Sequence, residues 1–188
     1  MLTRLRAKIL KVLHRPVYFD SDFSDRQSQD QKNILLFLTP HLFTGKSILH
    51  VGIRNSEIAK RFSSYATFID GITIVKREKR KAEKLNLSNY KVYIKNKYRK
   101  FSLGKKYDII IDNNLASYGC CEKHIRDIFE SYANMLNNKE MIITEIHGLQ
   151  HHFEGVTKGF DYQKLKKISS EFSLFVNRIG SMYVIKKI

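Results

Sequence analysis

The sequence predicts an α/β fold in which a mostly parallel β-sheet has helices on both faces. Short apolar runs typical of strands alternate along the chain with segments of helical periodicity, as in parallel sheets. One such run, 48–51, ends at Gly52 and leads within a few residues into a helical pattern, which predicts a strand, a tight turn and a helix. The last two apolar runs, 174–179 and 182–188, predict a terminal hairpin that makes one strand antiparallel.

The composition is that of a folded and strongly basic chain. Its 188 residues are 43% hydrophobic, which is enough for one domain with a core, and its formal net charge is +16. This charge favours an anionic partner, although abundant Lys, Asn and Ile are also typical of proteins from AT-rich genomes. The adjacent Cys120 and Cys121 predict two reduced thiols. Since no apolar run has the length of a membrane span and no secretory signal is evident, we expect a cytoplasmic protein.

The first 33 residues are predicted to form a helical extension of a domain that spans 34–188. Residues 2–14 have the spacing of a basic amphipathic helix. Such a helix can make peripheral contact with an anionic membrane or bind nucleic acid, or it can dock on the domain or stay partly disordered. A second helix is expected to start near Ser24 and to end before Pro40.

The segments between these helices and the terminal hairpin alternate between the two periodicities. They contain no internal repeat and no low-complexity tract. Short, apolar and often β-branched runs predict strands at 66–75, 92–94, 107–112 and 141–144. Apolar residues at helical spacing predict helices at 56–63, 76–85, 122–136 and 160–172.

The order of these segments resembles that of class I S-adenosylmethionine-dependent methyltransferases over residues 34–188. Segment 48–56, Ile-Leu-His-Val-Gly-Ile-Arg-Asn-Ser, is similar to the first motif of that family, an apolar strand followed by a Gly-x-Gly turn. Segments 71–75, 107–114 and 136–143 resemble the second strand, the fourth strand and the approach to the fifth. The resemblance implies a Rossmann-like, mostly parallel seven-stranded sheet with a C-terminal antiparallel hairpin and helices on both faces.

The resemblance also implies S-adenosylmethionine as the cofactor, but three positions depart from the family pattern. His50 stands where an acidic residue is common, Arg54 where the second glycine is expected, and Thr73 where a carboxylate usually holds both ribose hydroxyls. A threonine can make one such hydrogen bond. Arg54 can point to solvent, pair with the cofactor carboxylate or another anion, or fill the pocket. The cofactor-binding residues implied by the motifs are His50, Gly52, Arg54, Asn55, Ser56, Thr73, Asn96, Asp112 and Asn113.

Residues after the fourth and fifth strands would face the methyl acceptor. Methyl transfer is a direct displacement, so a positioned base matters where the acceptor must lose a proton. His147 is the candidate base because the pKa of imidazole suits neutral pH, and Asn114 and Tyr118 complete the candidate catalytic set. The histidine can equally be an ordinary loop residue. We expect no metal site, because Gly148 interrupts the helix in which His147 and His151 would have ligand spacing.

Segment 76–106 concentrates the positive charge, with thirteen Lys or Arg residues against two Glu. Interleaved aromatic residues make it suitable as a path for single-stranded RNA or an anionic substrate, or it can be a solvated surface with its rings packed inward. Two functions therefore stay open. One is a methyltransferase acting on a small metabolite, a sugar or RNA. The other is a binding module of the same fold that has lost the cofactor and binds RNA, an anionic membrane or a protein.

Overall fold

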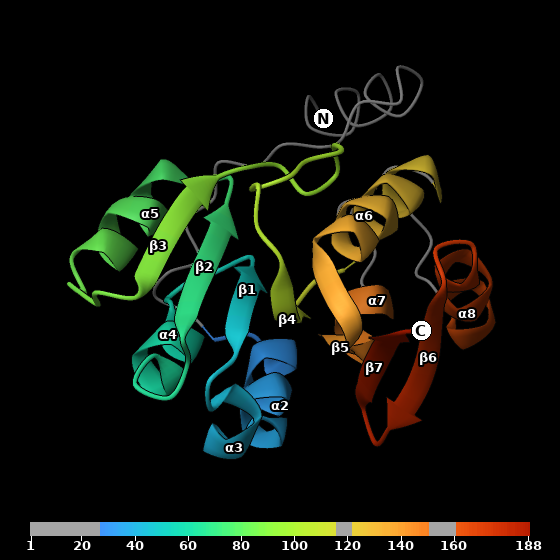
Figure 1. Ribbon diagram of the computed structural model, residues 1–188, viewed down its shortest axis with the longest axis horizontal. Coiled ribbons are helices and arrows are strands. Elements are labelled where there is room, and N and C mark those ends of the chain that lie inside the picture. The colour runs from blue at the N-terminus through green and yellow to red at the C-terminus, as the bar shows by residue number, and fades with distance from the viewer. Residues whose placement is uncertain (1–26, 116–121, 151–160) are drawn as a thin grey trace, which may run out of the picture.

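The computed structural model describes residues 27–115, 122–150 and 161–188, which form one seven-stranded sheet with helices on both sides (Figure 1). The strands lie in the order β3-β2-β1-β4-β5-β7-β6. Their bounds are β1 Ser47–Val51, β2 Phe68–Thr73, β3 Tyr90–Ile94, β4 Tyr107–Asp112, β5 Leu136–Glu145, β6 Leu174–Ile179 and β7 Met182–Lys187. The helices are α2 Gln29–Phe37, α3 Pro40–Phe43, α4 Glu57–Phe62, α5 Lys76–Glu83, α6 Glu122–Met135, α7 Ile146–Gln150 and α8 Tyr162–Ser170.

The pairing of the strands confirms the predicted fold class. Strand β1 pairs parallel with β2 on one side and with β4 on the other, and β3 and β5 extend the parallel part outward. Strand β7 pairs antiparallel with β5 and β6. The β6–β7 turn contains Gly180 at φ +59°, in the left-handed region where glycine has no steric penalty. The described chain therefore has the Rossmann-like, mostly parallel sheet with the closing hairpin.

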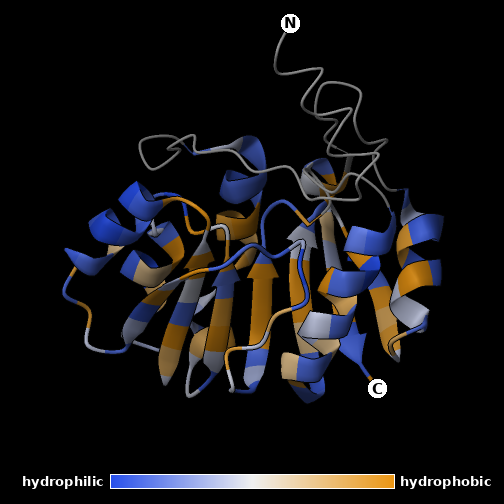
Figure 2. Cartoon of the chain, turned by 90° about the horizontal axis from the view of Figure 1, so that it is seen from above, coloured by the Kyte–Doolittle hydropathy of each residue, from blue (hydrophilic) through white to orange (hydrophobic). Residues whose placement is uncertain are grey.

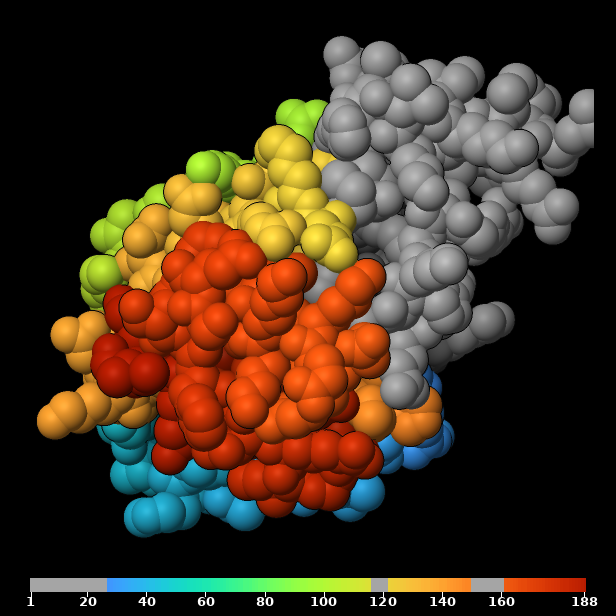
Figure 3. All heavy atoms as spheres, turned by 90° about the vertical axis from the view of Figure 1, so that its right-hand side faces the viewer, coloured from blue at the N-terminus to red at the C-terminus, as the bar shows by residue number. Residues whose placement is uncertain are grey.

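Two apolar layers cover the two faces of the sheet. Alternation along β1 sends Leu49 and Val51 toward one face and Ile48 toward the other. The first layer packs against α6, α7 and α8, and the second packs against α2, α3 and α4. Figure 2 shows the hydrophobic residues gathered on the central strands, with hydrophilic residues on the outer sides of the helices. Seen from its right-hand side, the molecule presents mainly the C-terminal segments around α8 and the β6–β7 hairpin (Figure 3).

Helix α2 crosses the point at which the sequence was divided into an extension and a domain. It runs from residue 29 to residue 37, and Ile34 and Leu35 on it are buried in the second apolar layer. Helix α2 ends at Phe37, before Pro40, as predicted. Pro40 is also the first residue of α3, a position where proline fits because its missing N–H has no helical partner. The boundary at residue 33 stays a prediction. The amphipathic segment 2–14 lies outside the described residues.

Two elements differ from the sequence expectations. Strand β5 starts at Leu136 instead of residue 141, because Leu136 already pairs with Tyr107 across an irregularity in the β4–β5 ladder. Helix α7 contains Gly148, which was expected to interrupt a helix. A Cβ at Gly148 would lie 2.0 Å from the carbonyl oxygen of Asn113, so glycine lets α7 pack directly on the segment after β4. None of the helices in the described ranges is long and apolar enough to cross a membrane.

Candidate active site

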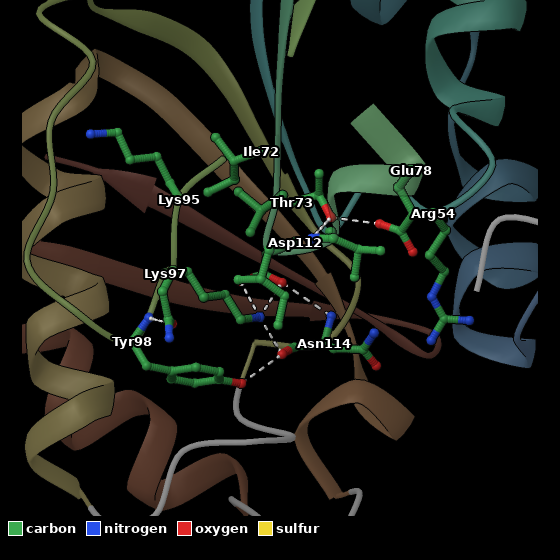
Figure 4. Close-up of a pocket in the computed structure, with 14 residues that line it drawn as sticks. Arg54, Ile72, Thr73, Glu78, Lys95, Lys97, Tyr98, Asp112 and Asn114 are labelled. Carbon is green, nitrogen blue, oxygen red and sulfur yellow. Dashed lines mark hydrogen bonds and ion pairs between the residues drawn. The ribbon is translucent and has the colours of Figure 1, made fainter. Parts of the chain in front are cut away.

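A pocket lies at the carboxyl ends of the parallel strands, where the order of strands reverses between β1 and β4. In open α/β sheets this reversal leaves a crevice that commonly holds a ligand. The pocket is built by the turn after β1, the end of β2 with the start of α5, the segment after β3 and the segment after β4 (Figure 4). Its lining residues are Val51, Gly52, Arg54, Ile72, Thr73, Ile74, Val75, Glu78, Lys95, Asn96, Lys97, Tyr98, Asp112 and Asn114.

The turn after β1 brings backbone and one cation to the pocket. Gly52 has φ +75°, and a Cβ built on it would meet no atom within 4 Å, so this backbone is open to a ligand. Arg54 has φ +47°, a conformation that is unfavourable for a residue with a side chain. The Asn114 amide is oriented by its neighbours: its nitrogen donates to Asp30 Oδ2 at 3.1 Å, and its oxygen accepts from Arg54 Nη2 at 3.3 Å. The Arg54 guanidinium thus lies between the turn and the segment after β4.

A buried carboxylate lies at the end of β2, although the strand itself ends in a threonine. Thr73 donates its hydroxyl proton to Glu78 Oε2 at 2.6 Å, and its own oxygen accepts from the N–H of Val75 at 3.0 Å. Glu78 is in the first turn of α5 and is 3% exposed (Figure 4). Glu78 is not among the residues that the family motifs implied, because the motif concerns the last position of the strand, which is Thr73. Its spacing, one helical turn after the strand, was the available signal.

Lys97 and Asp112 form a largely buried ion pair in the pocket. Their side chains are 12% and 1% exposed, and Lys97 Nζ donates to Asp112 Oδ1 at 2.7 Å and to the Asn114 carbonyl oxygen. Tyr132 on α6 donates to Asp112 Oδ2 at 2.7 Å. Burial lowers the pKa of Lys97, while the ion pair with Asp112 opposes this shift; burial and Asp112 raise the pKa of Tyr132 well above its usual value. The Asp112 carboxylate is therefore already compensated by protein groups.

His50 and Asn113 do not line the pocket. Each is fully buried, and neither side chain has a hydrogen-bond partner in the described structure. Burial lowers the pKa of His50 to about 3, so the imidazole is neutral at physiological pH. Their cofactor-binding roles, which were implied by motif position, have no geometric support from the pocket lining.

Asn55 and Ser56 connect the turn to neighbouring elements and are not among the lining residues. Asn55 Oδ1 accepts from Gln31 Nε2 at 2.8 Å and from the Glu57 N–H at 3.3 Å, so it links α2 to the start of α4. Ser56 Oγ accepts from the Tyr90 hydroxyl at 3.1 Å. Asn96 does line the pocket, but its side-chain oxygen accepts from the Tyr98 N–H at 3.0 Å. Of the predicted cofactor residues, the pocket gathers Gly52, Arg54, Thr73, Asn96 and Asp112.

The candidate catalytic residues are not all found at the pocket. Asn114 lines the pocket, and Tyr118 lies outside the described residues. His147 lies on α7, where its ring contacts the buried carboxylate of Glu145 at 2.8 Å. The described residues contain no group of three or more His, Cys, Asp or Glu side chains placed to hold a metal ion.

Not every cation of segment 76–106 belongs to an exposed surface. Lys97 is one of the thirteen cations of this segment, but its side chain is largely buried in the pair with Asp112. Lys100 pairs with Glu130 at 2.6 Å, and Lys105 pairs with Asp70 at 2.8 Å. Exposed cations remain on α5, at its C-terminal cap and on β3, among them Lys76, Arg77, Arg80, Lys84 and Lys91.

Comparison with solved structures shows where this fold occurs. The N-methyltransferase NodS of Bradyrhizobium japonicum WM9 in complex with S-adenosyl-L-homocysteine superposes with a TM-score of 0.66 at 12% identity, covering 97% of this chain and 96% of that one. A methyltransferase from Clostridium acetobutylicum gives 0.64 at 11% identity over 100% and 99%. Magnesium protoporphyrin IX methyltransferase of Synechocystis PCC 6803 with bound S-adenosylmethionine gives 0.63 at 14% identity over 97% of each chain. No family model and no curated protein sequence matches the chain. The fold is therefore that of the class I methyltransferases.

Proposed function

We propose that the protein is an S-adenosylmethionine-dependent methyltransferase. The observation that carries the proposal is the buried Glu78 carboxylate at the carboxyl end of β2, in a pocket at the topological switch point. The last residue of β2 is Thr73, so the strand itself has no acidic residue at its carboxyl end. The structure supplies the acid from α5, bonded to that threonine.

The residues of the pocket suit the parts of the proposed cofactor. Glu78 and Thr73 present oxygen atoms that can accept hydrogen bonds from ribose hydroxyls. Ile72 and Val75 give the pocket an apolar wall suitable for an adenine ring. The open backbone at Gly52 admits close approach, and we assign to Arg54 the carboxylate of the amino-acid part, because a guanidinium binds carboxylates in a bidentate manner. Bound S-adenosylmethionine supplies an activated methyl group.

The methyl acceptor is proposed more broadly, as a small metabolite, a sugar or RNA. The solved structures of this fold include an N-methyltransferase and a magnesium protoporphyrin IX methyltransferase, so the fold serves dissimilar acceptors. A fold shared at such low identity selects none of them for this chain.

Isothermal titration calorimetry with S-adenosylhomocysteine tests the proposal. We expect saturable binding by the unmodified protein and a loss of about tenfold or more in affinity for Glu78→Gln, because a charged acceptor contributes more to hydrogen bonding than a neutral one. Glu83→Gln is the matched control, since Glu83 is an exposed acid on the same helix that pairs with Lys79. Absence of heat and of a thermal shift with both S-adenosylmethionine and S-adenosylhomocysteine at millimolar concentration would contradict the proposal.

A further inference from the structure

A carboxylate and an imidazole form a pair at the end of β5. Glu145 is completely buried. Its Oε2 accepts from the His147 backbone N–H at 2.6 Å, and its two oxygens lie 2.8 and 3.0 Å from the ring nitrogen Nδ1 of His147. Asn33 of α2 donates to Glu145 Oε1 at 3.0 Å. Three polar groups thus contact one buried carboxylate, while the His147 side chain itself is 61% exposed.

This arrangement determines which ring nitrogen carries the proton. An ionised carboxylate can only accept hydrogen bonds, so His147 Nδ1 must donate to Glu145. In the neutral ring the lone pair is then on Nε2, at the opposite side of the ring from Glu145. Burial of Glu145 and the bond from Asn33 keep the carboxylate, and hence the ring, in place.

The pair lies next to the segment that ends the cofactor pocket. Gly148, the residue after His147, packs against the Asn113 carbonyl so closely that a Cβ would lie 2.0 Å from it. Asn114, the next residue of that segment, lines the pocket. Figure 1 shows α7 beside β5, on the opposite side of β4 from α5, the helix that carries Glu78. His147 does not line the pocket itself, but the Gly148 contact holds α7 against the segment that leads into the lining residue Asn114.

We propose that His147 is the general base of the methyl transfer, that Glu145 and Asn33 are its positioning residues, and that the acceptor belongs to the class with an O–H or N–H proton to lose. The inference rests on the proposed function. His147 Nε2 takes the acceptor's proton while the freed electron pair of the acceptor oxygen or nitrogen bonds to the methyl carbon. The electron pair of the breaking carbon–sulfur bond stays on sulfur. The resulting imidazolium lies against the Glu145 carboxylate and later releases the proton to water.

The role of His147 as a base determines the chemical class of the methyl acceptor. A thioether or a tertiary amine has no proton to lose and needs no base, so a held imidazole would be of no use to it. A hydroxyl, phenol or protonated-nitrogen acceptor needs one, and the carboxylate behind the ring stabilises the charge that develops there.

The tautomer can be measured without an acceptor. Nitrogen-15 correlation spectra of the full chain, with the His147 ring assigned by comparison with His147→Gln, should show a protonated Nδ1 and an unprotonated Nε2 at a pH where the ring is neutral. Glu145→Gln, which keeps the side-chain shape, should shift the ring toward a mixture of tautomers, and Asn33→Ala should do so more weakly. A protonated Nε2 in the unmodified protein overturns the proposal.

Cofactor titration tests the position of the ring. Saturation with S-adenosylmethionine should shift the His147 ring resonances, while the exposed His41 on α3 should not respond. His147→Gln should bind S-adenosylhomocysteine with an affinity within about twofold of the unmodified protein, because the imidazole acts on the acceptor. Cofactor binding that leaves the His147 resonances unchanged overturns the inference alone, whereas no cofactor binding overturns the proposed function.

Discussion

At the scale of single residues, His50 is the clearest departure from the pattern of the resembling family. An acidic residue at this point in β1 would be ionised, whereas His50 is fully buried, without a hydrogen-bond partner in the described structure, and neutral. Its pKa is lowered by burial from the ordinary 6.5 to about 3. Unfolding exposes the ring and restores its ordinary pKa, so His50 links the stability of the fold to pH.

The sign of this linkage follows from the two pKa values of His50. Between about pH 6.5 and pH 3 the unfolded chain binds a proton that the folded chain does not, so the free energy of unfolding falls as the pH falls. At 1.36 kcal/mol per pH unit, His50 should reduce this free energy by about 2 kcal/mol between pH 7 and pH 5. His50→Leu should remove that part of the decrease in urea unfolding experiments. The exposed His41→Leu is the control, and an equal decrease in both variants would show that His50 does not cause it.

Arg54 supports a second prediction at this scale. Its positive φ favours glycine, so Arg54→Gly should leave the free energy of unfolding unchanged or raise it by up to about 1 kcal/mol. The same change removes the proposed partner of the cofactor carboxylate and should weaken S-adenosylhomocysteine binding by about tenfold in calorimetry. Arg54→Lys keeps the charge but lacks the forked donors, so its affinity for S-adenosylhomocysteine should lie between those of the unmodified protein and Arg54→Gly. Tighter binding by Arg54→Gly would instead show that the side chain obstructs the pocket.

The residues of the site show what a sequence can and cannot predict. Gly52, Thr73 and Asp112 were implied by the resemblance of their segments to the family motifs, and each lies at or directly after the carboxyl end of a strand that faces the pocket. Glu78 was missed because its role depends on how α5 returns to the end of β2, which is a tertiary contact. Burial of Lys97 was missed for the same reason, since its neighbours in sequence are exposed cations.

At the scale of elements, helix α7 positions both His147 and the segment after β4. This helix could not be predicted from the local pattern, because its Gly148 is unfavourable for an isolated helix and is required by a contact with Asn113. Strand β4, by contrast, was predicted to the residue, since a continuous apolar run flanked by polar residues is typical of a central parallel strand. Local patterns predict elements buried on both faces better than elements shaped by one close contact.

Gly148→Ala tests this packing. The new methyl group would meet backbone atoms, which cannot move as a side-chain end can, so α7 must shift away from the Asn113 carbonyl. We expect a loss of about 1–3 kcal/mol in the free energy of unfolding, measured with urea, and a disturbed His147 tautomer in nitrogen-15 spectra. Lys166→Ala on the exposed side of α8 is the control and should change neither. Unchanged stability of Gly148→Ala would show that the contact is looser than the structure has it.

At the scale of the whole molecule, neither the apolar core nor the proposed methyl transfer accounts for the net charge of +16. Ion pairs neutralise some of the cations of segment 76–106. The Lys97 side chain is largely buried and adds little to the exposed basic surface of this segment. The remaining exposed cations lie on α5 and on β3, which is the strand at one edge of the sheet. Binding of RNA there stays a proposal, and its electrostatic component can be measured separately from methyl transfer.

Salt dependence is the measurement that isolates this component. Each phosphate contact with a single strand contributes about 0.7 to the slope of log affinity against log salt concentration, because binding releases a condensed counterion. Replacing Lys76, Arg80, Lys84 and Lys91 by Gln should therefore reduce the slope for a labelled oligouridylate by up to about 3, while leaving S-adenosylhomocysteine binding unchanged. An equal number of exposed lysines elsewhere, Lys32, Lys166, Lys167 and Lys186, provides the control with the same total charge. If both variants lose the same slope, the attraction comes from net charge alone, and the surface formed by α5 and β3 is not an RNA site.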